Sequence, residues 1–390
     1  MGQAKKQYEQ RFWDESHLEG EKYVCEDHID DASICAFITE YSEEGTCSYC
    51  NCKTRVALVE DVIRFIKEGV FYFYGDANDE GVSYASEEEG YNGAATYDTE
   101  EMLEDAGLEV DNDILRKEIF HAFGHNTWCD IDPYADRENV ELSYNWKEFK
   151  QVVKHKSRYV FLGSKQFQTG IQSLPVDEIL NDIGRRVDDL NLFRWLDSGT
   201  NLYRCRQHST TEVLEKAGQL TSPPDDKAVF PNRMSPAGIS MFYCAFDKMT
   251  CHLETVEPLD LSKEKVTTGV FKNKEKLFLL DLTNLPALPS IFDPKSRKYY
   301  YSILFLHHFV NDFTKPVSKD GRQHIEYVPT QIVTEYFRYT YTDLTEVSID
   351  GILYPSSKIK GKNACVLFYD HKQSLNALEF DYDMLVIEDV

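Results

Sequence analysis

The stretch Asn232–Glu254 reads NRMSPAGISMFYCAFDKMTCHLE, and it determines the fold that we expect for the second half of the chain. It begins with a turn that carries Arg233. Ser240–Ala245 follows, and its short run of apolar and aromatic residues predicts a strand that contains Tyr243. The segment after this strand predicts a helix that carries Glu254. The stretch therefore presents three polar side chains on three consecutive elements.

The rest of the chain after Gly199 has a similar pattern of short strands and helices. Short β-branched or aromatic segments bounded by Gly, Pro, Asn or Asp predict further strands, and these are Leu277–Leu282, Gly351–Pro355 and Ala364–Tyr369. Between them we expect helices at Tyr300–Asp312 and Pro329–Tyr339. This mixture of segregated strands and helices indicates an α+β fold class.

The first half of the chain is mainly helical by its apolar periodicity. One amphipathic helix has apolar residues at spacings of 0, 3, 4 and 7, and we expect it to end at Gly69; these residues are Val59, Val62, Ile63 and Ile66. Two further helices are predicted around Trp146–Val153 and Val176–Leu190, while residues 71–98 predict short strands and loops.

Composition limits the classes of function. The chain has 390 residues, 24 Tyr and 23 Phe, which favours several packed domains over disorder. Its formal net charge of −25 works against a nucleic-acid partner, because Lys and Arg hold the phosphate backbone. No run of 18 apolar residues appears, and Met1–Gln10 is polar, so we expect a cytoplasmic protein without a membrane partner.

Cysteines crowd near the N-terminus in a pattern typical of a metal site. Cys25-x2-His28 and Cys47-x2-Cys50 are two ligand pairs, and four N/S ligands suit tetrahedral Zn²⁺ in a structural role. Cys35 or Cys52 could replace one of them, and unliganded thiols in a small core are the alternative. We therefore predict a zinc-binding module at residues 1–55, a helical domain at 56–197 and a second domain at 198–390.

Three polar segments of the second half resemble a known family when they are taken together. They are Leu202–Arg206 with Arg204, Asn232–Glu254, and Asp350–Ser357 continuing to Asn363. The order Arg, Arg, Tyr, Glu and Ser in these segments resembles the RES family. Tyr327–Gln331 resembles the family segment that opens the helix before the third of them. The N-terminal part resembles the HEPN-like region that precedes some RES domains. Met234, Ser235 and Cys244 depart from the common family pattern.

The resemblance implies an ADP-ribosyltransferase-like fold that consumes NAD⁺ as its substrate, often as a bacterial toxin or defence effector. Cleavage of the nicotinamide–ribose bond passes through an oxocarbenium-like ribose, so a carboxylate beside it stabilises the transition state. We assign this role to Glu254, with Arg204 and Ser356 as further catalytic residues. The NAD⁺-binding residues that we expect are Arg204, Arg233, Tyr243, Thr330 and Gln331.

The sequence alone is compatible with other functions. The same site could transfer ADP-ribose to a protein target. Arg116 and His121 have the Arg-x4-His spacing of HEPN ribonucleases, although helical geometry should point the two side chains apart. The N-terminal region could instead be a non-catalytic interaction module that restrains or targets the RES domain. An antitoxin or regulatory protein and a homo-oligomer are candidate partners. We also expect residues 196–390 alone to hydrolyse NAD⁺.

Overall fold

The computed structural model describes residues 20–390 except 86–89, 161–177, 257–259, 261 and 318–320. These residues form two compact units. Unit 1 contains residues up to Glu138 together with Ala287–Tyr301, and unit 2 contains Asn139–Pro286 together with Ser302–Val390. By packing, residues 139–197 thus belong with the C-terminal residues, whereas the three domains predicted from the sequence stay a prediction.

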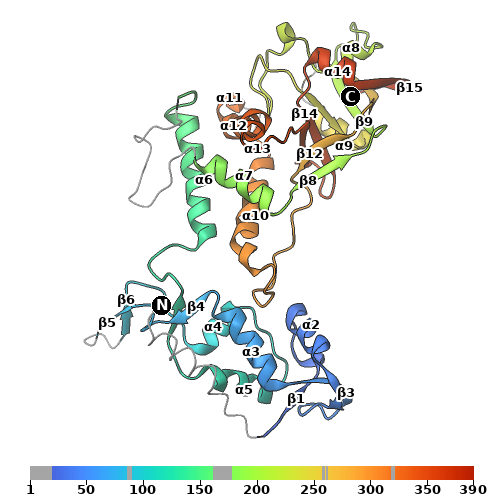
Figure 1. Cartoon of the computed structure of the whole chain (residues 1–390). Coiled ribbons are helices and arrows are strands. Elements are labelled where there is room, and N and C mark those ends of the chain that lie inside the picture. Colours follow the sequence, from blue (N-terminus) through green and yellow to red (C-terminus); the bar gives the residue numbers. More distant parts are fainter. Residues whose placement is uncertain (1–19, 86–89, 161–177, 257–259, 261, 318–320) are drawn as a thin grey trace. The chain divides into compact units, whose positions relative to one another are not determined.

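Unit 1 is built from short strands and four helices among its described residues (Figure 1). The helices are α2 (Ala32–Glu40), α3 (Val59–Val70), α4 (Thr99–Asp105) and α5 (Asp113–Phe123), with 3-10 turns η1 (Glu26–His28) and η4 (Arg297–Tyr299). The strands are β1 (Tyr23–Val24), β2 (Glu43–Thr46), β3 (Lys53–Leu58), β4 (Tyr74–Asp76), β5 (Ser83–Ala85), β6 (Gly90–Asn92) and β7 (Trp128–Asp130). They pair as β1-β3-β2, β4-β7 and β5-β6.

Helix α3 shows why the amphipathic pattern predicts a helix here. Its four predicted apolar residues are all buried in the core of unit 1. Gly69 does not end the helix, which continues to Val70, so this part of the prediction is wrong. This glycine serves packing inside the helix: a Cβ on Gly69 would lie 2.5 Å from Cδ1 of Phe292, and only glycine permits this approach.

Unit 2 contains one eight-stranded mixed sheet with the order β15-β11-β9-β10-β14-β13-β12-β8. Its strands are β8 (Phe193–Leu196), β9 (Asn201–His208), β10 (Phe242–Ala245), β11 (Lys265–Asn273), β12 (Leu277–Asp281), β13 (Gly351–Pro355), β14 (Asn363–Leu367) and β15 (Leu378–Asp389). Its helices are α6 (Glu138–His155), α7 (Glu178–Asp189), α8 (Ala217–Leu220), α9 (Lys248–Thr255), α10 (Tyr300–Thr314), α11 (Gln323–Glu326), α12 (Val328–Glu335), α13 (Tyr341–Thr345) and α14 (His371–Ala377), with 3-10 turn η3 (Asp225–Lys227) and π-helix η5 (Tyr336–Thr340).

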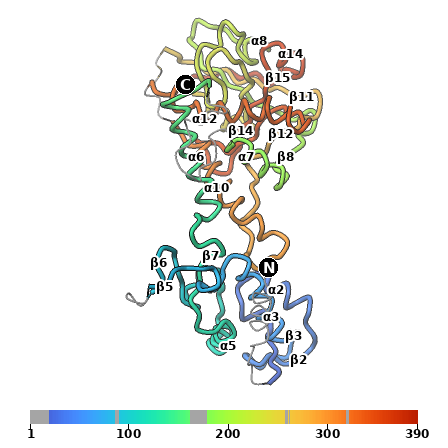
Figure 2. Tube along the Cα trace, turned by 60° about the vertical axis from the view of Figure 1, so that its left-hand side comes forward, coloured from blue at the N-terminus to red at the C-terminus, as the bar shows by residue number. Residues whose placement is uncertain are grey.

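The two faces of this sheet are covered separately, because side chains alternate along a strand. On β13, Ile352 and Tyr354 pack into the core formed with helices α6, α7, α10 and α12. Leu353, between them, packs into the core of the opposite face. Helices α6 and α10 lie side by side (Figures 1 and 2), and Trp146 Nε1 donates to Asp312 over 2.8 Å. The α+β fold class predicted from the sequence is confirmed.

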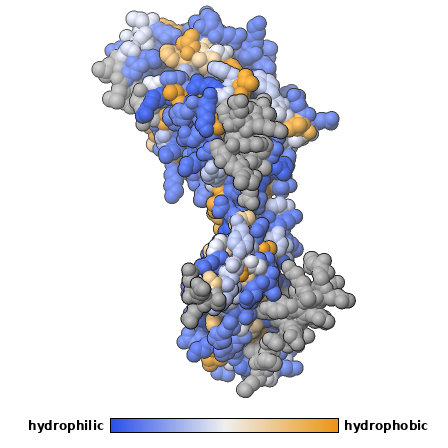
Figure 3. All heavy atoms as spheres, turned by 90° about the vertical axis from the view of Figure 1, so that its left-hand side faces the viewer, coloured by the Kyte–Doolittle hydropathy of each residue, from blue (hydrophilic) through white to orange (hydrophobic). Residues whose placement is uncertain are grey.

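One face of the molecule is mainly hydrophilic. Figure 3 shows hydrophilic side chains over most of the face in view, with apolar groups scattered among them. No helix within the described residues has both the length and the apolar character that crossing a membrane requires.

Candidate functional site

Strands β9 and β10 are joined by very little backbone pairing. β10 pairs with β14 at four positions but with β9 only at Ala245↔Tyr203. The carbonyl of Tyr243, beyond this single pair, instead accepts a hydrogen bond of 2.6 Å from Nη1 of Arg204. The same guanidinium lies over the ring of Phe242, 5.0 Å from its centroid. The arginine side chain therefore bridges the two strands where backbone pairing has stopped.

Tyr243 connects β10 to the turn that carries Arg233. Its hydroxyl lies 2.9 Å from Oγ of Ser235 and accepts a bond of 3.3 Å from the backbone N–H of Met234. Burial raises the pKa of Tyr243 to about 12, so the phenol stays protonated at neutral pH. Nη1 of Arg233 donates to the carbonyl of Lys315 at 2.7 Å. The turn and its arginine thus have a defined position beside the sheet.

Thr330 and Gln331 hold the same turn from the opposite side. Both side chains are buried on α12. Gln331 Nε2 donates to the carbonyls of Asn232 (2.8 Å) and Ser235 (3.3 Å), and Thr330 Oγ1 donates to the carbonyl of Arg233. These contacts give the two residues a supporting role. Their predicted contact with NAD⁺ stays a prediction.

Glu254 lies near the end of α9, which Asp247 caps by accepting a bond of 2.8 Å from the Thr250 N–H. One carboxylate oxygen of Glu254, Oε1, accepts a hydrogen bond of 2.5 Å from Oγ of Ser356. The same oxygen accepts a bond of 3.0 Å from the N–H of Ser357. The structure therefore brings together two residues that the sequence places about a hundred positions apart.

Tyr354 also belongs to this group, and it is not among the site residues predicted from the sequence. Tyr243 and Ile352 both align with Val366 of β14, which puts them on one face, and Tyr354 follows on that face. Burial raises the pKa of Tyr354 well above its ordinary value, as do the charges of Glu254 and Tyr243, while Arg233 lowers it. Tyr354 thus lies close to Glu254, Tyr243 and Arg233. The sequence could have indicated it, because it stands two residues before Ser356 and alternate residues of a strand share a face.

The four predicted metal ligands also lie together, in unit 1. The ligand atoms of Cys25, His28, Cys47 and Cys50 are all within 4.8 Å of one another. Nε2 of His28 is buried and has no hydrogen-bond partner, which is costly unless something else binds it. Burial also raises the pKa of the Cys25 thiol to about 12. One imidazole nitrogen and three sulfurs are a donor set that fits a metal ion.

The local backbone explains how Cys47 and Cys50 face the same point. The N–H of Cys47 donates to the carbonyl of Cys52 over 2.9 Å, and Asn51 has a positive φ of 59°, which closes a tight turn. The N–H of Tyr49 lies 3.5 Å from Sγ of Cys47. Cys35 instead donates its thiol to the carbonyl of Ile29 over 3.1 Å. Neither Cys35 nor Cys52 is part of the four-residue group.

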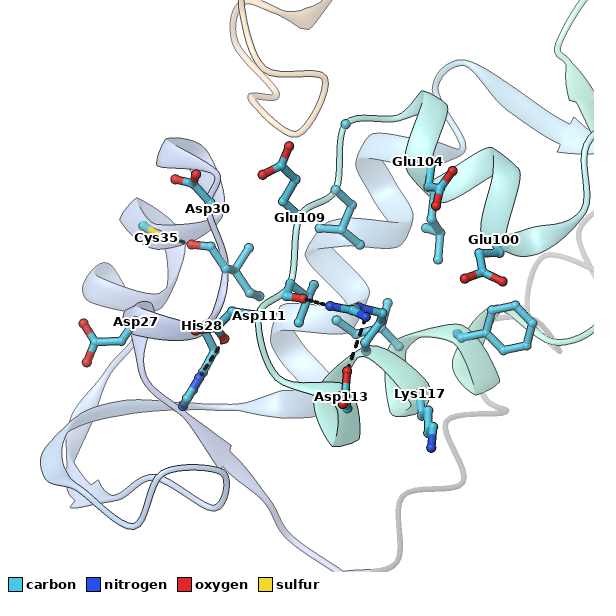
Figure 4. Close-up of a pocket in the computed structure, with 18 of the residues that line it drawn as sticks. Asp27, His28, Asp30, Cys35, Glu100, Glu104, Glu109, Asp111, Asp113 and Lys117 are labelled. Carbon is cyan, nitrogen blue, oxygen red and sulfur yellow. Dashed lines mark hydrogen bonds and ion pairs between the residues drawn. The ribbon is translucent and has the colours of Figure 1, made fainter.

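A cavity of about 1290 Å³ also lies in unit 1 (Figure 4). Arg116 and His121 are both among its lining residues, and the expectation that helical spacing points their side chains apart stays a prediction. Arg116 nevertheless donates to the carbonyl of Val110 and pairs with Asp113 at 3.3 Å. Eight carboxylates line the cavity: Glu26, Asp27, Asp30, Glu100, Glu104, Glu109, Asp111 and Asp113. This charge disfavours a phosphate backbone.

Comparison with protein families gives two matches, which cover separate parts of the chain. Residues 201–383 match the RES domain, and residues 40–167 match HEPN/RES N-terminal domain 1. No curated protein matches the chain. Every residue of the Arg204–Ser356 group lies within the first match, whereas Cys25 and His28 lie outside the second. The RES match is consistent with an enzyme that acts on NAD⁺.

Proposed function

We propose, from the premise that this chain is a RES-domain protein with a HEPN/RES N-terminal domain, that it cleaves the nicotinamide–ribose bond of NAD⁺. The observation that carries the proposal is the contact of Glu254 with Ser356 beside the buried Tyr354. A carboxylate held by two donors at one oxygen is oriented before any substrate arrives. Such preorganised charge is the usual source of transition-state stabilisation.

The reaction takes place at C1′ of the ribose that carries nicotinamide, and positive charge develops on this ribose. The bond from ribose C1′ to the nicotinamide nitrogen breaks, and nicotinamide leaves with the bonding electrons. An oxygen of water or phosphate then forms a bond to C1′ and loses a proton. We assign Oε2 of Glu254 to the positive charge that develops on the ribose, since Ser356 and Ser357 already bind Oε1. The enzyme is accordingly a glycohydrolase or a phosphorylase.

The two arginines supply the positive charge that an anionic dinucleotide needs in a chain of net charge −25. Arg204 and Arg233 each use Nη1 on a backbone carbonyl, and their remaining N–H groups are those we assign to the pyrophosphate. Tyr243, held by Ser235, provides an aromatic surface for the nicotinamide ring. Ser356 assists by positioning Glu254.

The test is product analysis with the full chain. We expect NAD⁺ incubated with the protein to yield nicotinamide and ADP-ribose, or a phosphorylated ADP-ribose when phosphate is present, both identified by mass. Glu254→Gln should abolish both products. Intact NAD⁺ after incubation with folded protein would contradict the proposal. ADP-ribose attached to an added protein, without free product, would favour the alternative of mono-ADP-ribosyltransfer.

We further propose that the Cys25, His28, Cys47 and Cys50 group binds one structural Zn²⁺. Three thiolates and an imidazole suit the tetrahedral preference of this ion, and four protein ligands leave no position for a substrate. The zinc supplies folding free energy to unit 1 and takes no part in NAD⁺ cleavage. Elemental analysis should find one zinc per chain in protein purified without chelator, and its absence would contradict the site.

For the N-terminal domain we favour an interaction role with an antitoxin or regulatory protein over a nuclease. Arg116 is already paired with Asp113, and the cavity that it shares with His121 is lined by carboxylates. The full chain should therefore leave labelled RNA intact. RNA cleavage that disappears in His121→Ala would reverse this preference.

A further inference from the structure

A segment distant in the sequence runs beside the metal-ligand group. Ile29 and Val110 form an isolated antiparallel bridge. On one side of it, the N–H of Asp30 donates to the carbonyl of Glu109 over 3.1 Å; on the other, the N–H of Asp111 donates to the carbonyl of His28 over 3.1 Å. These backbone bonds fix Asp111 next to His28, although 83 positions separate them. The placement does not depend on either side chain.

The side chains of this pair then meet. Nδ1 of His28 lies 3.1 Å from Oδ1 of Asp111 (Figure 4). The imidazole is buried, with 9% of its side chain exposed, whereas 67% of the Asp111 side chain is exposed. When Nδ1–H donates to a carboxylate, the neutral ring must present its lone pair at Nε2. Nε2 is the buried atom that lacks a partner.

We propose that Asp111 is the positioning residue of the metal site: it holds the imidazole of His28 in the tautomer and orientation that present Nε2 to the metal. This inference rests on the proposed zinc site. A carboxylate behind a metal-binding histidine both fixes the ring and increases the basicity of its free nitrogen. Asp111 itself is no ligand, since the four-residue group excludes it. Because the Asp111 carboxylate is exposed, its charge stays hydrated and adds no desolvation cost to the site.

Asp113 provides a matched comparison on the same segment. It is an exposed carboxylate two residues away, and the ion pair that it forms is with Arg116 at 3.3 Å. Figure 4 shows Asp111 directed at His28, whereas Asp113 lies apart from that contact. Removing either carboxylate changes the charge of the cavity equally. Only the removal of Asp111 should disturb the metal.

The experiment measures metal affinity in the full chain. Metal-free wild type, Asp111→Ala, Asp111→Asn and Asp113→Asn are titrated with Zn²⁺ against a chromophoric chelator. We expect Asp111→Ala to weaken binding about 10- to 100-fold, the effect of losing such an outer partner, and Asp113→Asn to bind as the wild type does. Asp111→Asn should be intermediate, because an amide oxygen can still accept but carries no charge. Equal affinities for Asp111→Ala and Asp113→Asn would overturn the proposal.

A second measurement separates positioning from general stabilisation. Without metal, Asp111→Ala and wild type should unfold at the same denaturant concentration; with metal, the variant should unfold at a lower one. A loss of stability that is equal with and without metal would show a merely structural role and overturn the proposal. A wild-type chain that binds neither Zn²⁺ nor Co²⁺ would remove the zinc site and this inference together. That result would leave the proposed cleavage of NAD⁺ untouched.

Discussion

The metal-ligand group of unit 1 and the Glu254 group of unit 2 are assembled in opposite ways. The first uses two short motifs between Cys25 and Cys50, each closed by a local turn. The second takes residues from β9, β10, α9, α12 and the end of β13. A local backbone turn sets the geometry of each short motif, whereas residues from distant segments come together only when the sheet is correctly folded. The two sites should therefore respond differently to single substitutions.

The largest effect is expected at the local site. Cys47→Ser replaces one of four ligands with a hydroxyl, which binds zinc poorly, and should lower metal affinity on the order of a thousandfold or more. Elemental analysis of the purified variant checks this. Cys52→Ser is the matched control, because Cys52 lies in the same turn but outside the four-residue group. Metal retained in Cys47→Ser but lost in Cys52→Ser would show that Cys52 is the ligand.

The next effect concerns the chemistry of unit 2. Glu254→Gln preserves shape while removing the charge opposite the ribose, so the rate of NAD⁺ consumption should fall roughly 100-fold or more. Thermal unfolding of the variant verifies that the fold persists. The exposed Glu264 offers a control, since Glu264→Gln should leave the rate unchanged. A folded Glu254→Gln variant with full activity would remove this carboxylate from the mechanism.

Arg204→Lys tests whether the arginine side chain that bridges β9 and β10 contributes to activity. Lysine keeps the charge but loses the planar fork that reaches both the Tyr243 carbonyl and a phosphate. Loss of a charged hydrogen bond of about 1.5–3 kcal/mol predicts a decrease in kcat/KM of about 10- to 150-fold. Arg206→Lys, on the same strand but paired with Glu212, should change little. Equal effects of the two changes would show that the bridge has no special role.

The smallest effect is expected for Tyr354→Phe. The ring remains packed in the core, so only the hydroxyl contribution of about 0.5–1.5 kcal/mol is lost, and kcat/KM should fall about two- to twelvefold. Tyr382→Phe, at an exposed position of β15, controls for loss of a phenol elsewhere. Steady-state kinetics at fixed pH measure both. An unchanged kcat/KM for Tyr354→Phe would place this residue in the core alone.

The same contrast explains what could be predicted from the sequence. The four metal ligands were accessible because their spacing is local, and the helices and strands followed from apolar periodicity. Asp111 was not accessible, because an isolated bridge between distant segments brings it to His28. Tyr354 escaped because a buried strand tyrosine resembles any core residue. The single backbone pair between β9 and β10 leaves no trace in composition or periodicity.

Packing also revises one expectation about truncation. The core of unit 2 includes Phe149 of α6 and Ile183 of α7 together with Phe309 of α10. A chain that begins at residue 196 would lose the first two and expose the third. Residues 196–390 alone should therefore fail to fold and to hydrolyse NAD⁺, in contrast to the expectation from the sequence. The sequence could not show this, because a helix pattern indicates an apolar face without naming its partner.

The contribution of residues 287–301 to unit 1 has a consequence for the order of events during synthesis. Ile291 and Phe292 are part of the core of unit 1, and Gly69 leaves room for Phe292. A ribosome that has translated residue 138 has therefore not yet made a complete unit 1. At about 5–20 residues per second, the missing segment arrives roughly 10 to 30 s later. The residues of unit 1 are therefore complete only after residues 139–286 of unit 2 have been made, at a time when unit 2 itself still lacks β13, β14 and β15.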